Sequence, residues 1–144
     1  MRLPGSPIMD RRVTIRSAEW SDLAEIGRIQ GRSPWRPKDY LNYKCHVATL
    51  GGRVVGFVSS RETAPDEHEI LFIGVDPAHR RQGIAQKLLK DQLAASRGTW
   101  FLEVRESNIP AINLYLSMGF VATGRRPNYY SDPDETAIVM RIFS

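Results

Sequence analysis

A short basic loop with one glycine, Arg80 to Ala85, is the part of this sequence best suited to bind an anion. It follows an apolar stretch, Glu67 to Val75, that reads as a buried strand, and it precedes an amphipathic pattern that reads as a helix. The first turn of a helix presents backbone N–H groups without intrahelical acceptors, and the helix dipole also favours negative charge there. The spacing therefore predicts a diphosphate site where this helix begins.

Several other interpretations of the loop can be compared with this one. A P-loop is excluded because the Gly-Lys-Ser/Thr ending is missing, and a dinucleotide fingerprint because the three-glycine spacing is missing. An ordinary strand-to-helix turn with solvated arginines stays open. The order Arg80, Arg81, Gln82, Gly83, Ile84, Ala85 resembles the Arg/Gln-x-x-Gly-x-Gly/Ala signature of the acetyl-CoA-binding loop in the GNAT superfamily of N-acetyltransferases.

A second stretch, Phe101 to Phe120, narrows the resemblance. Its sequence FLEVRESNIPAINLYLSMGF is similar to the bacterial ribosomal-protein-alanine N-acetyltransferases, the RimI family. The downstream groups Arg126-Pro-Asn-Tyr129-Tyr130 and Glu135-x-Ala137-x-x-Met140 match further elements of that family. The resemblance covers about residues 12 to 143. It implies an α+β GNAT fold: a central mixed, mostly antiparallel sheet of about seven strands, splayed at the cofactor cleft, with about four helices.

The same resemblance implies a reaction. An acetyl group passes from acetyl-CoA to the α-amino group of an N-terminal alanine on a ribosomal protein. The amine must lose a proton, the thioester carbonyl must be polarised, and the leaving thiolate must be protonated. An α-amino group has a pKa of about 7.7–8.0, so a modest base is sufficient.

Two glutamates compete for the role of base. Glu103 stands where the family places its general base, and strand alternation puts it on one face with Phe101 and Arg105. Without the resemblance, Glu103 reads as a structural carboxylate paired with Arg105 or a neighbouring strand. Glu69 lies fourteen residues before Gly83, a spacing at which many GNAT enzymes carry a catalytic glutamate. We expect Glu103 to be the base and Glu69 to bind or relay.

Tyr115 and Asn108 share one predicted helix, seven residues apart. Tyr115 occupies the family's general-acid position, and a phenol with a pKa of about 10 stays protonated at neutral pH and can donate to a thiolate. The alternative is a buried aromatic on an apolar helix face. Asn108 can cap the helix, and in the family it also contacts the pantetheine arm of the cofactor.

The remaining site residues follow from the resemblance. Backbone groups near Ile73, Gly74 and Val75 are expected to pair with the pantetheine arm like a missing strand. The diphosphate is expected to bind at the segment Arg80, Arg81, Gln82, Gly83, Ile84 and Ala85. The alternative for one of the two arginines is that it is only solvated. The candidates for acceptor binding are Trp35, Glu69, Arg126, Tyr129 and Tyr130. The tyrosines can instead form an aromatic plug at the sheet edge, and Pro127 and the acidic Ser131–Glu135 segment depart from closer family members.

The elements that must position these residues can be predicted from periodicity and breakers. A helix over residues 17–30 is predicted to bury Trp20, Leu23, Ala24 and Ile26, and the pair Gly51-Gly52 predicts a tight hairpin turn. A polar loop with Pro127, Tyr129, Tyr130 and Pro133 is predicted between the last two strands. Strands are predicted at 12–16, 46–50, 53–60, 67–75, 100–105, 120–124 and 136–143, and helices at 17–30, 37–43, 84–97 and 109–118.

Composition limits the class of protein. The 144 residues suit a single domain, which we expect at 12–144 after a flexible extension at 1–11, where Met9 is a possible start. No apolar run reaches the roughly 20 residues that cross a bilayer, and the lone Cys45 fits a reducing cytoplasm. No Cys, His and carboxylate cluster has metal-ligand spacing. The net charge of +4 is spread along the chain, so no direct nucleic-acid partner is expected.

Three functions remain open. The first is acetylation of the N-terminal alanine of a ribosomal protein, and the second is acetylation of another protein N-terminus or a small amine. The third is a non-catalytic acyl-CoA-binding domain, against which Glu103, Tyr115 and the intact loop argue. The sequence leaves the oligomeric state open, with a monomer the simpler expectation.

Overall fold

The protein is described by a computed structural model at residues 12–31, 33 and 35–144. The extension predicted at 1–11 lies outside these residues. Contacts divide the chain into two compact units. The first unit takes the described residues up to Ser60 together with Phe72–Gln92, and the second takes Arg61–Leu71 with Leu93–Ser144.

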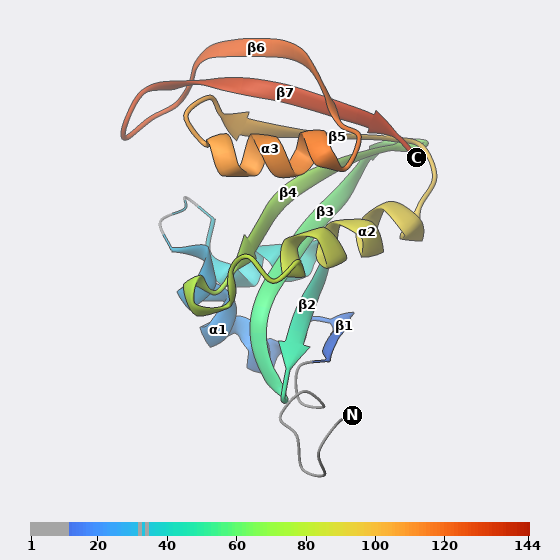
Figure 1. Ribbon diagram of the computed structural model, residues 1–144, viewed down its shortest axis with the longest axis vertical. Coiled ribbons are helices and arrows are strands. Elements are labelled where there is room, and N and C mark those ends of the chain that lie inside the picture. Colours follow the sequence, from blue (N-terminus) through green and yellow to red (C-terminus); the bar gives the residue numbers. More distant parts are fainter. Residues whose placement is uncertain (1–11, 32, 34) are drawn as a thin grey trace, which may run out of the picture. The chain divides into compact units, whose positions relative to one another are not determined.

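The elements follow the predicted order, except that the helix predicted at 37–43 is the 3₁₀ helix η3, and two further short 3₁₀ turns are added (Figure 1). They are β1 (Val13–Ser17), η2 (Trp20–Asp22), α1 (Leu23–Gln30), η3 (Pro37–Asn42), β2 (Lys44–Leu50), β3 (Arg53–Ala64), β4 (Glu67–Val75), η4 (Pro77–His79), α2 (Ile84–Ala95), β5 (Thr99–Arg105), α3 (Ile109–Ser117), β6 (Val121–Tyr130) and β7 (Glu135–Phe143).

Seven strands form a mixed sheet in the order β1-β2-β3-β4-β5-β7-β6. The pairs β1–β2, β2–β3, β5–β7 and β6–β7 are antiparallel. The pair β4–β5 is parallel, with its register running from Glu67↔Thr99 to Glu69↔Phe101. The predicted GNAT sheet of seven strands is therefore confirmed.

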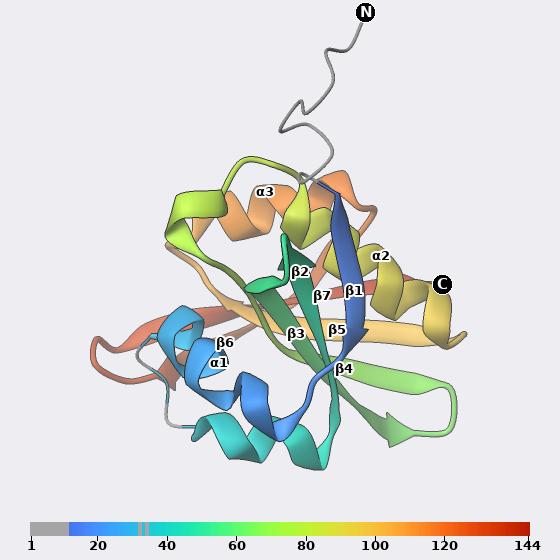
Figure 2. The same ribbon diagram turned by 90° about the horizontal axis from the view of Figure 1, so that it is seen from below.

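In the first unit, helices cover both faces of β2 and β3, with α1 and η3 on one side and α2 on the other (Figure 2). Ile26, Tyr40 and Phe57 form the centre of the core on the α1 side, and all are nearly or fully buried. On the other side, Gly56 lets α2 approach closely. A Cβ there would lie 3.0 Å from the Gly74 carbonyl oxygen and 3.2 Å from atoms of Ile84 and Leu88. Strand β4, which precedes the basic loop, and helix α2, which follows it, therefore both pack against Gly56.

In the second unit, α3 lies along one side of β5, β7 and β6 (Figure 1). Strand β5 alternates as predicted: Trp100, Leu102 and Val104 are buried, and the residues between them are only partly covered. Helix α3 has the predicted ends, since the Asn108 side chain accepts a hydrogen bond from the Ala111 N–H (3.3 Å), and Gly119 follows with φ of 102°.

Two structural predictions were wrong. Trp20 is 73% exposed and Ala24 is also exposed, because the segment begins as the 3₁₀ turn η2, which changes the helical phase ahead of Ile26. The polar loop predicted around Pro127, Tyr129 and Tyr130 is instead the second half of strand β6. Strand β6 pairs on one side only, at the edge of the sheet, so a proline without an N–H is tolerated there.

Across the described residues, no helix is long and apolar enough to cross a membrane. The same part of the chain holds no group of three or more His, Cys, Asp or Glu side chains able to hold a metal ion. Cys45 is buried in the core of the first unit, and burial raises the pKa of its thiol to about 12, so it is an apolar core residue.

Candidate active site

The basic loop starts from a buried carboxylate. Asp76 follows β4, and its backbone N–H donates to the Val55 carbonyl (2.8 Å). Its carboxylate accepts hydrogen bonds from Arg28 (3.1 Å) and pairs with the His79 ring (3.0 Å). Burial acts to raise the pKa of Asp76, but these bonds and the Ala78 N–H together hold that pKa below its ordinary value. Asp76 therefore stays ionised at neutral pH, and its hydrogen bonds hold the start of the loop in place.

The loop itself places backbone N–H groups beside exposed cations. Arg81 and Gly83 both adopt the left-handed region, with φ of 63° and 79°. Successive backbone N–H groups in a turn with left-handed residues can form an anion-binding concavity. Arg80, Arg81, Gln82 and Gly83 are exposed, and a Cβ added at Gly83 would meet no atom within 4 Å. An exposed loop with that open space fits a diphosphate.

The helix that follows is firmly seated. Ile84 is 2% exposed, and Leu88 and Leu89 are fully buried, which fixes the first turn of α2 against the sheet. The N–H groups of its first residues, Ile84, Ala85 and Gln86, have no acceptor within the helix and lie next to the loop. Ile73, Gly74 and Val75 form the end of β4 and are partly buried. Their backbone pairing with a pantetheine arm stays a prediction.

In the second unit, Glu103 is a nearly buried carboxylate on β5, its side chain 9% exposed. Its Oε1 lies 3.6 Å from a guanidinium nitrogen of Arg126 on β6. Its Oε2 is buried and has no hydrogen-bond partner among the described residues. The expected structural pairing with Arg105 is not formed, because Arg105 pairs with Glu135 instead (3.3 Å). A buried carboxylate oxygen without a donor is costly, which is common where a ligand completes the site.

Glu69 is held differently. It is the last residue of β4 in register with β5, opposite Phe101. Its Oε1 accepts a hydrogen bond from Nε of Arg61 (2.8 Å) and forms an ion pair with Nη2 of the same guanidinium (2.8 Å). One oxygen of each glutamate therefore faces a guanidinium, at 2.8 Å for Glu69 and at 3.6 Å for Glu103, and the second oxygen of Glu103 is the one that is buried without a partner among the described residues.

Tyr129 and Tyr130 stand beside the two carboxylates. Their rings pack edge to face with centroids 5.0 Å apart, and the Arg126 guanidinium lies 5.7 Å from the Tyr129 ring centre. Burial raises the pKa of Tyr129, and the neighbouring Glu103 and Glu69 charges raise it further. Burial and the Glu103 charge also raise the pKa of Tyr130 to about 12. Both phenols are therefore donors at neutral pH that can face carboxylates or a bound peptide.

Tyr115 projects from α3 into the interior of the second unit, where it is 6% exposed and packs against Phe120 (5.8 Å between ring centres). Burial raises its pKa far above the ordinary phenol value, and the neighbouring Tyr130 adds to this shift. The phenol therefore keeps its proton throughout the neutral range. The Glu103 charge raises the pKa of Tyr130, and Tyr130 raises the pKa of Tyr115, so these three side chains of the second unit interact electrostatically.

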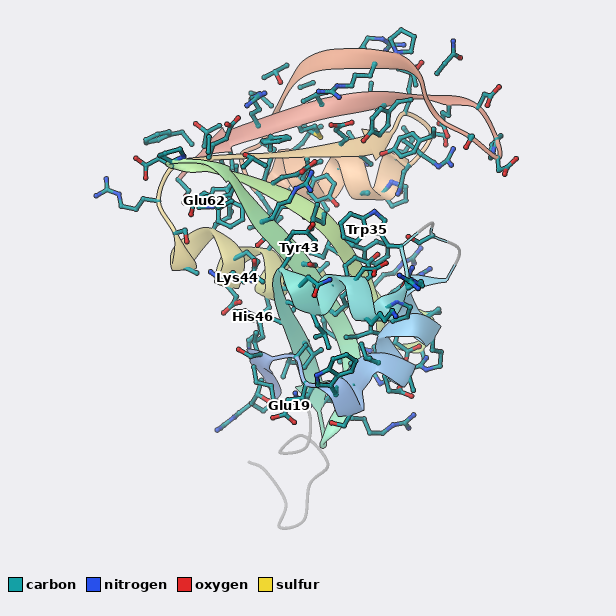
Figure 3. All side chains as sticks on the ribbon, turned by 180° about the vertical axis from the view of Figure 1, so that it is seen from behind. Glu19, Trp35, Tyr43, Lys44, His46 and Glu62 are labelled. Atoms are coloured by element: carbon teal, nitrogen blue, oxygen red, sulfur yellow. The ribbon has the colours of Figure 1, made fainter. Side chains whose placement is uncertain are left out.

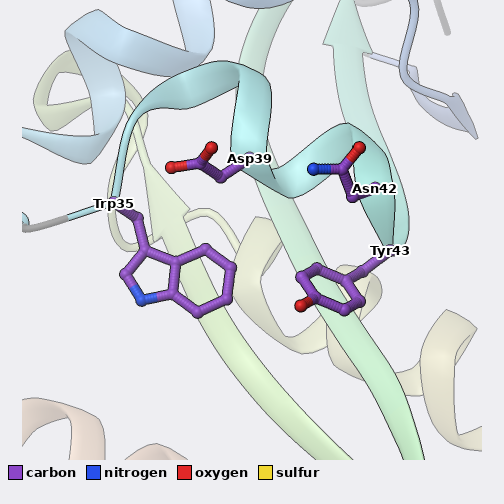
Figure 4. Close-up of a pocket in the computed structure, with 4 residues that line it drawn as sticks. All are labelled: Trp35, Asp39, Asn42 and Tyr43. Atoms are coloured by element: carbon purple, nitrogen blue, oxygen red, sulfur yellow. The ribbon is translucent and has the colours of Figure 1, made fainter.

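Trp35 belongs to the first unit, and the preceding residue, Pro34, lies outside the described residues. Trp35 stacks on Tyr40 with ring centres 5.4 Å apart and tilts against Tyr43 at 5.7 Å. Figure 3 shows Trp35 and Tyr43 among the other side chains. Trp35 and Tyr43, with Asp39 and Asn42, line an open pocket of about 350 Å³ (Figure 4). The predicted aromatic thus packs against the core of the first unit and also forms one wall of this pocket.

Sequence reasoning missed several residues of these sites: Asp39, Asn42, Tyr43, Arg61 and Glu135. The contact of Arg61 with Glu69 could have been predicted from the sequence, because a hairpin turn at residues 65–66 places residues before the turn opposite residues after it. That signal was lost because the third strand was predicted to end at Ser60, whereas β3 continues to Ala64. The pocket residues near Trp35 leave no comparable pattern.

Comparison with known proteins places these features in a family. The profile described as "Acetyltransferase (GNAT) family" matches residues 13–120. An N-alpha-acetyltransferase RimI of Mycobacterium tuberculosis is 39% identical over 144 residues, covering 90% of this chain and 91% of the relative. An uncharacterised protein of Mycobacterium leprae is 37% identical over 123 residues, but the match covers only 34% of that longer protein.

The [ribosomal protein bS18]-alanine N-acetyltransferase of Escherichia coli is 37% identical over 147 residues, covering 90% of this chain and 96% of the relative. A crystal structure of the ribosomal-protein-S18-alanine N-acetyltransferase from that organism superposes with a TM-score of 0.81 at 33% identity, covering 92% of this chain and 94% of that one.

Members of this family take their acetyl group from acetyl-CoA, a donor that the exposed N–H groups and arginines before α2 fit. The relatives from M. tuberculosis and E. coli match the chain over nearly its whole length and theirs. The chain therefore belongs to the GNAT family of acetyltransferases and is an acetyl-CoA-dependent N-acetyltransferase.

Proposed function

We propose that this enzyme acetylates the α-amino group of an N-terminal alanine on a ribosomal protein, with Glu103 as general base and Tyr115 as general acid. The acceptor assignment is supported by the name of the E. coli relative, which is a ribosomal-protein-alanine N-acetyltransferase. The observation that carries the assignment of roles is the buried Oε2 of Glu103, which has no donor within the described chain.

An incoming ammonium group supplies the missing donor. Its N–H can hydrogen-bond to Glu103 Oε2 and then lose its proton to that oxygen, which leaves a neutral amine as nucleophile. Glu69 serves this step as a binding carboxylate on the same side of the sheet, its charge balanced by Arg61. Tyr129, Tyr130 and Arg126 form the wall on which the acceptor peptide lies, and Trp35 contributes a second aromatic surface.

Acetyl-CoA, when bound, supplies an acetyl group activated as a thioester. Arg80, Arg81 and the N–H groups from Gln82 to Ala85 bind its diphosphate, and the backbone of Ile73 to Val75 and Asn108 orient its pantetheine arm. Tyr115 holds a proton at its phenol oxygen and donates it to the leaving sulfur. The neutral amine attacks the thioester carbonyl carbon directly, so no covalent enzyme intermediate is needed. As the C–N bond forms and the C–S bond breaks, the nitrogen loses its remaining extra proton, which passes through solvent to restore Tyr115, and Glu103 releases its proton to solvent.

A second candidate is acetylation of a different protein N-terminus. The M. tuberculosis relative favours it, because its name specifies an N-alpha-acetyltransferase and no ribosomal acceptor. The departures at Pro127 and in the acidic turn Ser131–Glu135 lie next to the proposed peptide wall, where they can change acceptor preference.

The test is CoA release with a synthetic peptide that begins Ala-Arg, set beside peptides with other first residues and a panel of small amines. Turnover with the Ala-Arg peptide well above the rest supports the ribosomal-alanine assignment. Turnover only with another N-terminus or amine contradicts it and selects the second candidate or a small-molecule acceptor. Mass spectrometry of ribosomal proteins from a strain that lacks the gene then checks the acceptor in the cell.

A further inference from the structure

One arginine outside the proposed chemistry ties three parts of the second unit together. Arg105 ends strand β5, and its guanidinium donates to the carbonyl oxygens of Ser131 (3.0 Å) and Pro133 (2.9 Å). It also donates to Glu135 Oε1 (3.3 Å). These three bonds hold the turn between β6 and β7, which otherwise would be an exposed loop tip.

The same guanidinium covers a candidate acceptor-binding tyrosine. The Arg105 Cζ atom lies 4.5 Å from the centre of the Tyr130 ring, within the range of a cation–π contact. The ring of Tyr130 packs edge to face on Tyr129 at 5.0 Å. Arg105 therefore fixes the position of Tyr130, and through it the angle at which the exposed Tyr129 is presented.

Glu135 extends this arrangement to the start of α3. Its Oε2 accepts the Ser107 N–H (2.6 Å), one residue before the Asn108 cap. The hydrogen bond from Ser107 and, to a smaller extent, Arg105 lower the pKa of Glu135, so it is a carboxylate at neutral pH. The turn, the tyrosine pair and the helix that bears Tyr115 are thus joined through one ion pair.

We propose that Arg105 is a positioning residue for acceptor binding, acting through Tyr130: its stacked, three-bonded guanidinium sets the tyrosine wall on which the acceptor peptide lies. This inference rests on the proposed acceptor role of Tyr129 and Tyr130. It requires a guanidinium, because a lysine can pair with Glu135 but cannot bond two carbonyls and stack flat on a ring at once.

The test measures acceptor KM, acetyl-CoA KM and kcat for Arg105→Gln with the Ala-Arg peptide. We expect the acceptor KM to rise about tenfold, with acetyl-CoA KM and kcat within about twofold, the size expected for losing a cation–π contact and charge-assisted hydrogen bonds. Arg105→Lys is expected to recover thermal stability but to keep the raised acceptor KM.

Arg141→Gln is the matched control. Arg141 on β7 makes the same two kinds of contact away from the tyrosine pair: its Cζ lies 5.0 Å from the Phe101 ring centre, and it pairs with Glu67 at 3.7 Å. We expect this variant to lose comparable stability and to keep a normal acceptor KM. An equal rise in acceptor KM for Arg141→Gln would show a general structural effect and overturn the inference.

A double-mutant cycle with Tyr130→Leu tests separately whether Tyr130 contributes to acceptor binding and whether Arg105 acts through it. If Arg105 acts through Tyr130, Arg105→Gln adds little to the acceptor KM once Tyr130 is leucine. The inference about Arg105 is overturned, while the proposed function stands, if the two substitutions are fully additive or if Arg105→Lys has a wild-type acceptor KM. It is also overturned if Arg105→Gln has a normal acceptor KM while that of Tyr130→Leu is abnormal. A normal acceptor KM in Tyr130→Leu instead removes the proposed acceptor role of Tyr130.

Discussion

At the scale of single residues, the two glutamates differ in what holds them. Arg61 engages one oxygen of Glu69 through two nitrogens at 2.8 Å. Glu103 has a longer contact to Arg126, at 3.6 Å, and lies beside the Tyr129 phenol, while its buried Oε2 has no hydrogen-bond partner among the described residues. A general base needs a free lone pair within reach of the proton it takes, and Glu103 has one.

We therefore expect Glu103→Gln to lower kcat by about 10²–10⁴-fold with acetyl-CoA affinity unchanged, the usual contribution of a general base. Glu69→Gln is expected to raise the acceptor KM with a smaller loss in kcat. Steady-state kinetics with the Ala-Arg peptide and calorimetry with acetyl-CoA measure both. If Glu69→Gln abolishes turnover while Glu103→Gln keeps a normal kcat, the two roles are reversed.

Tyr115 keeps its proton at neutral pH because burial penalises the phenolate. Tyr115→Phe is therefore expected to lower kcat by about 10²-fold or more, with little change in acetyl-CoA affinity, since only the donated proton is lost. Tyr40→Phe is the control, because Tyr40 is also buried, at 1% exposed, and carries no proposed role. A normal kcat in Tyr115→Phe would remove the assignment of general acid.

At the scale of elements, the loop before α2 depends on a positive φ at Gly83, a backbone conformation that residues with a side chain rarely adopt. Gly83 has φ of 79°, and Gly51, in the β2–β3 turn, has φ of 57°. Neither would place a Cβ within 4 Å of another atom. Alanine at either site is thus expected to have the same kind of backbone cost, about 1–2 kcal/mol, without a steric clash.

Gly83→Ala and Gly51→Ala should therefore lower the free energy of unfolding by similar amounts, while only Gly83→Ala weakens acetyl-CoA binding, because it shifts N–H groups that face the diphosphate. Urea unfolding and calorimetry with acetyl-CoA measure the two effects. Equal affinities in both variants would mean that this loop does not bind the donor.

The elements also show where sequence patterns were sufficient. The helix after the loop, the Asn108 cap, the Gly51-Gly52 turn and the alternation of β5 were predicted because each depends on residues close together in the chain. The second half of β6 was missed because its residues are almost all exposed, so no apolar alternation marks it, and Pro127 suggested a loop.

At the scale of the whole molecule, an ion pair with a buried carboxylate makes the free energy of unfolding depend on pH. Asp22 is 5% exposed and accepts two hydrogen bonds from Arg16 (2.8 and 2.9 Å) and one from the Glu19 N–H (2.8 Å). The hydrogen bonds from Arg16, above all, lower the pKa of Asp22 despite its burial. The unfolded chain therefore binds a proton there more readily than the folded one, and stability rises with pH in this range.

The contribution of Asp22 is expected to be complete above the unfolded pKa of about 3.9 and to be lost as the pH falls through the lower folded value. Asp22→Asn should reduce the free energy of unfolding at pH 7 by about 1–3 kcal/mol. It should also make the free energies of unfolding at pH 7 and pH 3 more alike than they are in the wild type. Urea unfolding at both pH values measures this. Asp134→Asn, in the exposed β6–β7 turn, is the control, and an unchanged pH dependence in Asp22→Asn would contradict the assignment.

The sequence alone determined the order of elements and, through its resemblance to a family, the donor, and it predicted a phosphate-binding loop at a helix start and the residues of the candidate chemistry. These features depend on neighbours along the chain and on motifs with fixed spacing. The tertiary structure decided which partner each charged side chain takes: Arg61 for Glu69, Arg126 for Glu103, and Tyr130 with Glu135 for Arg105. Such partners depend on strand length, register and side-chain burial, and a change of one residue in register moves a side chain to the other face of the sheet.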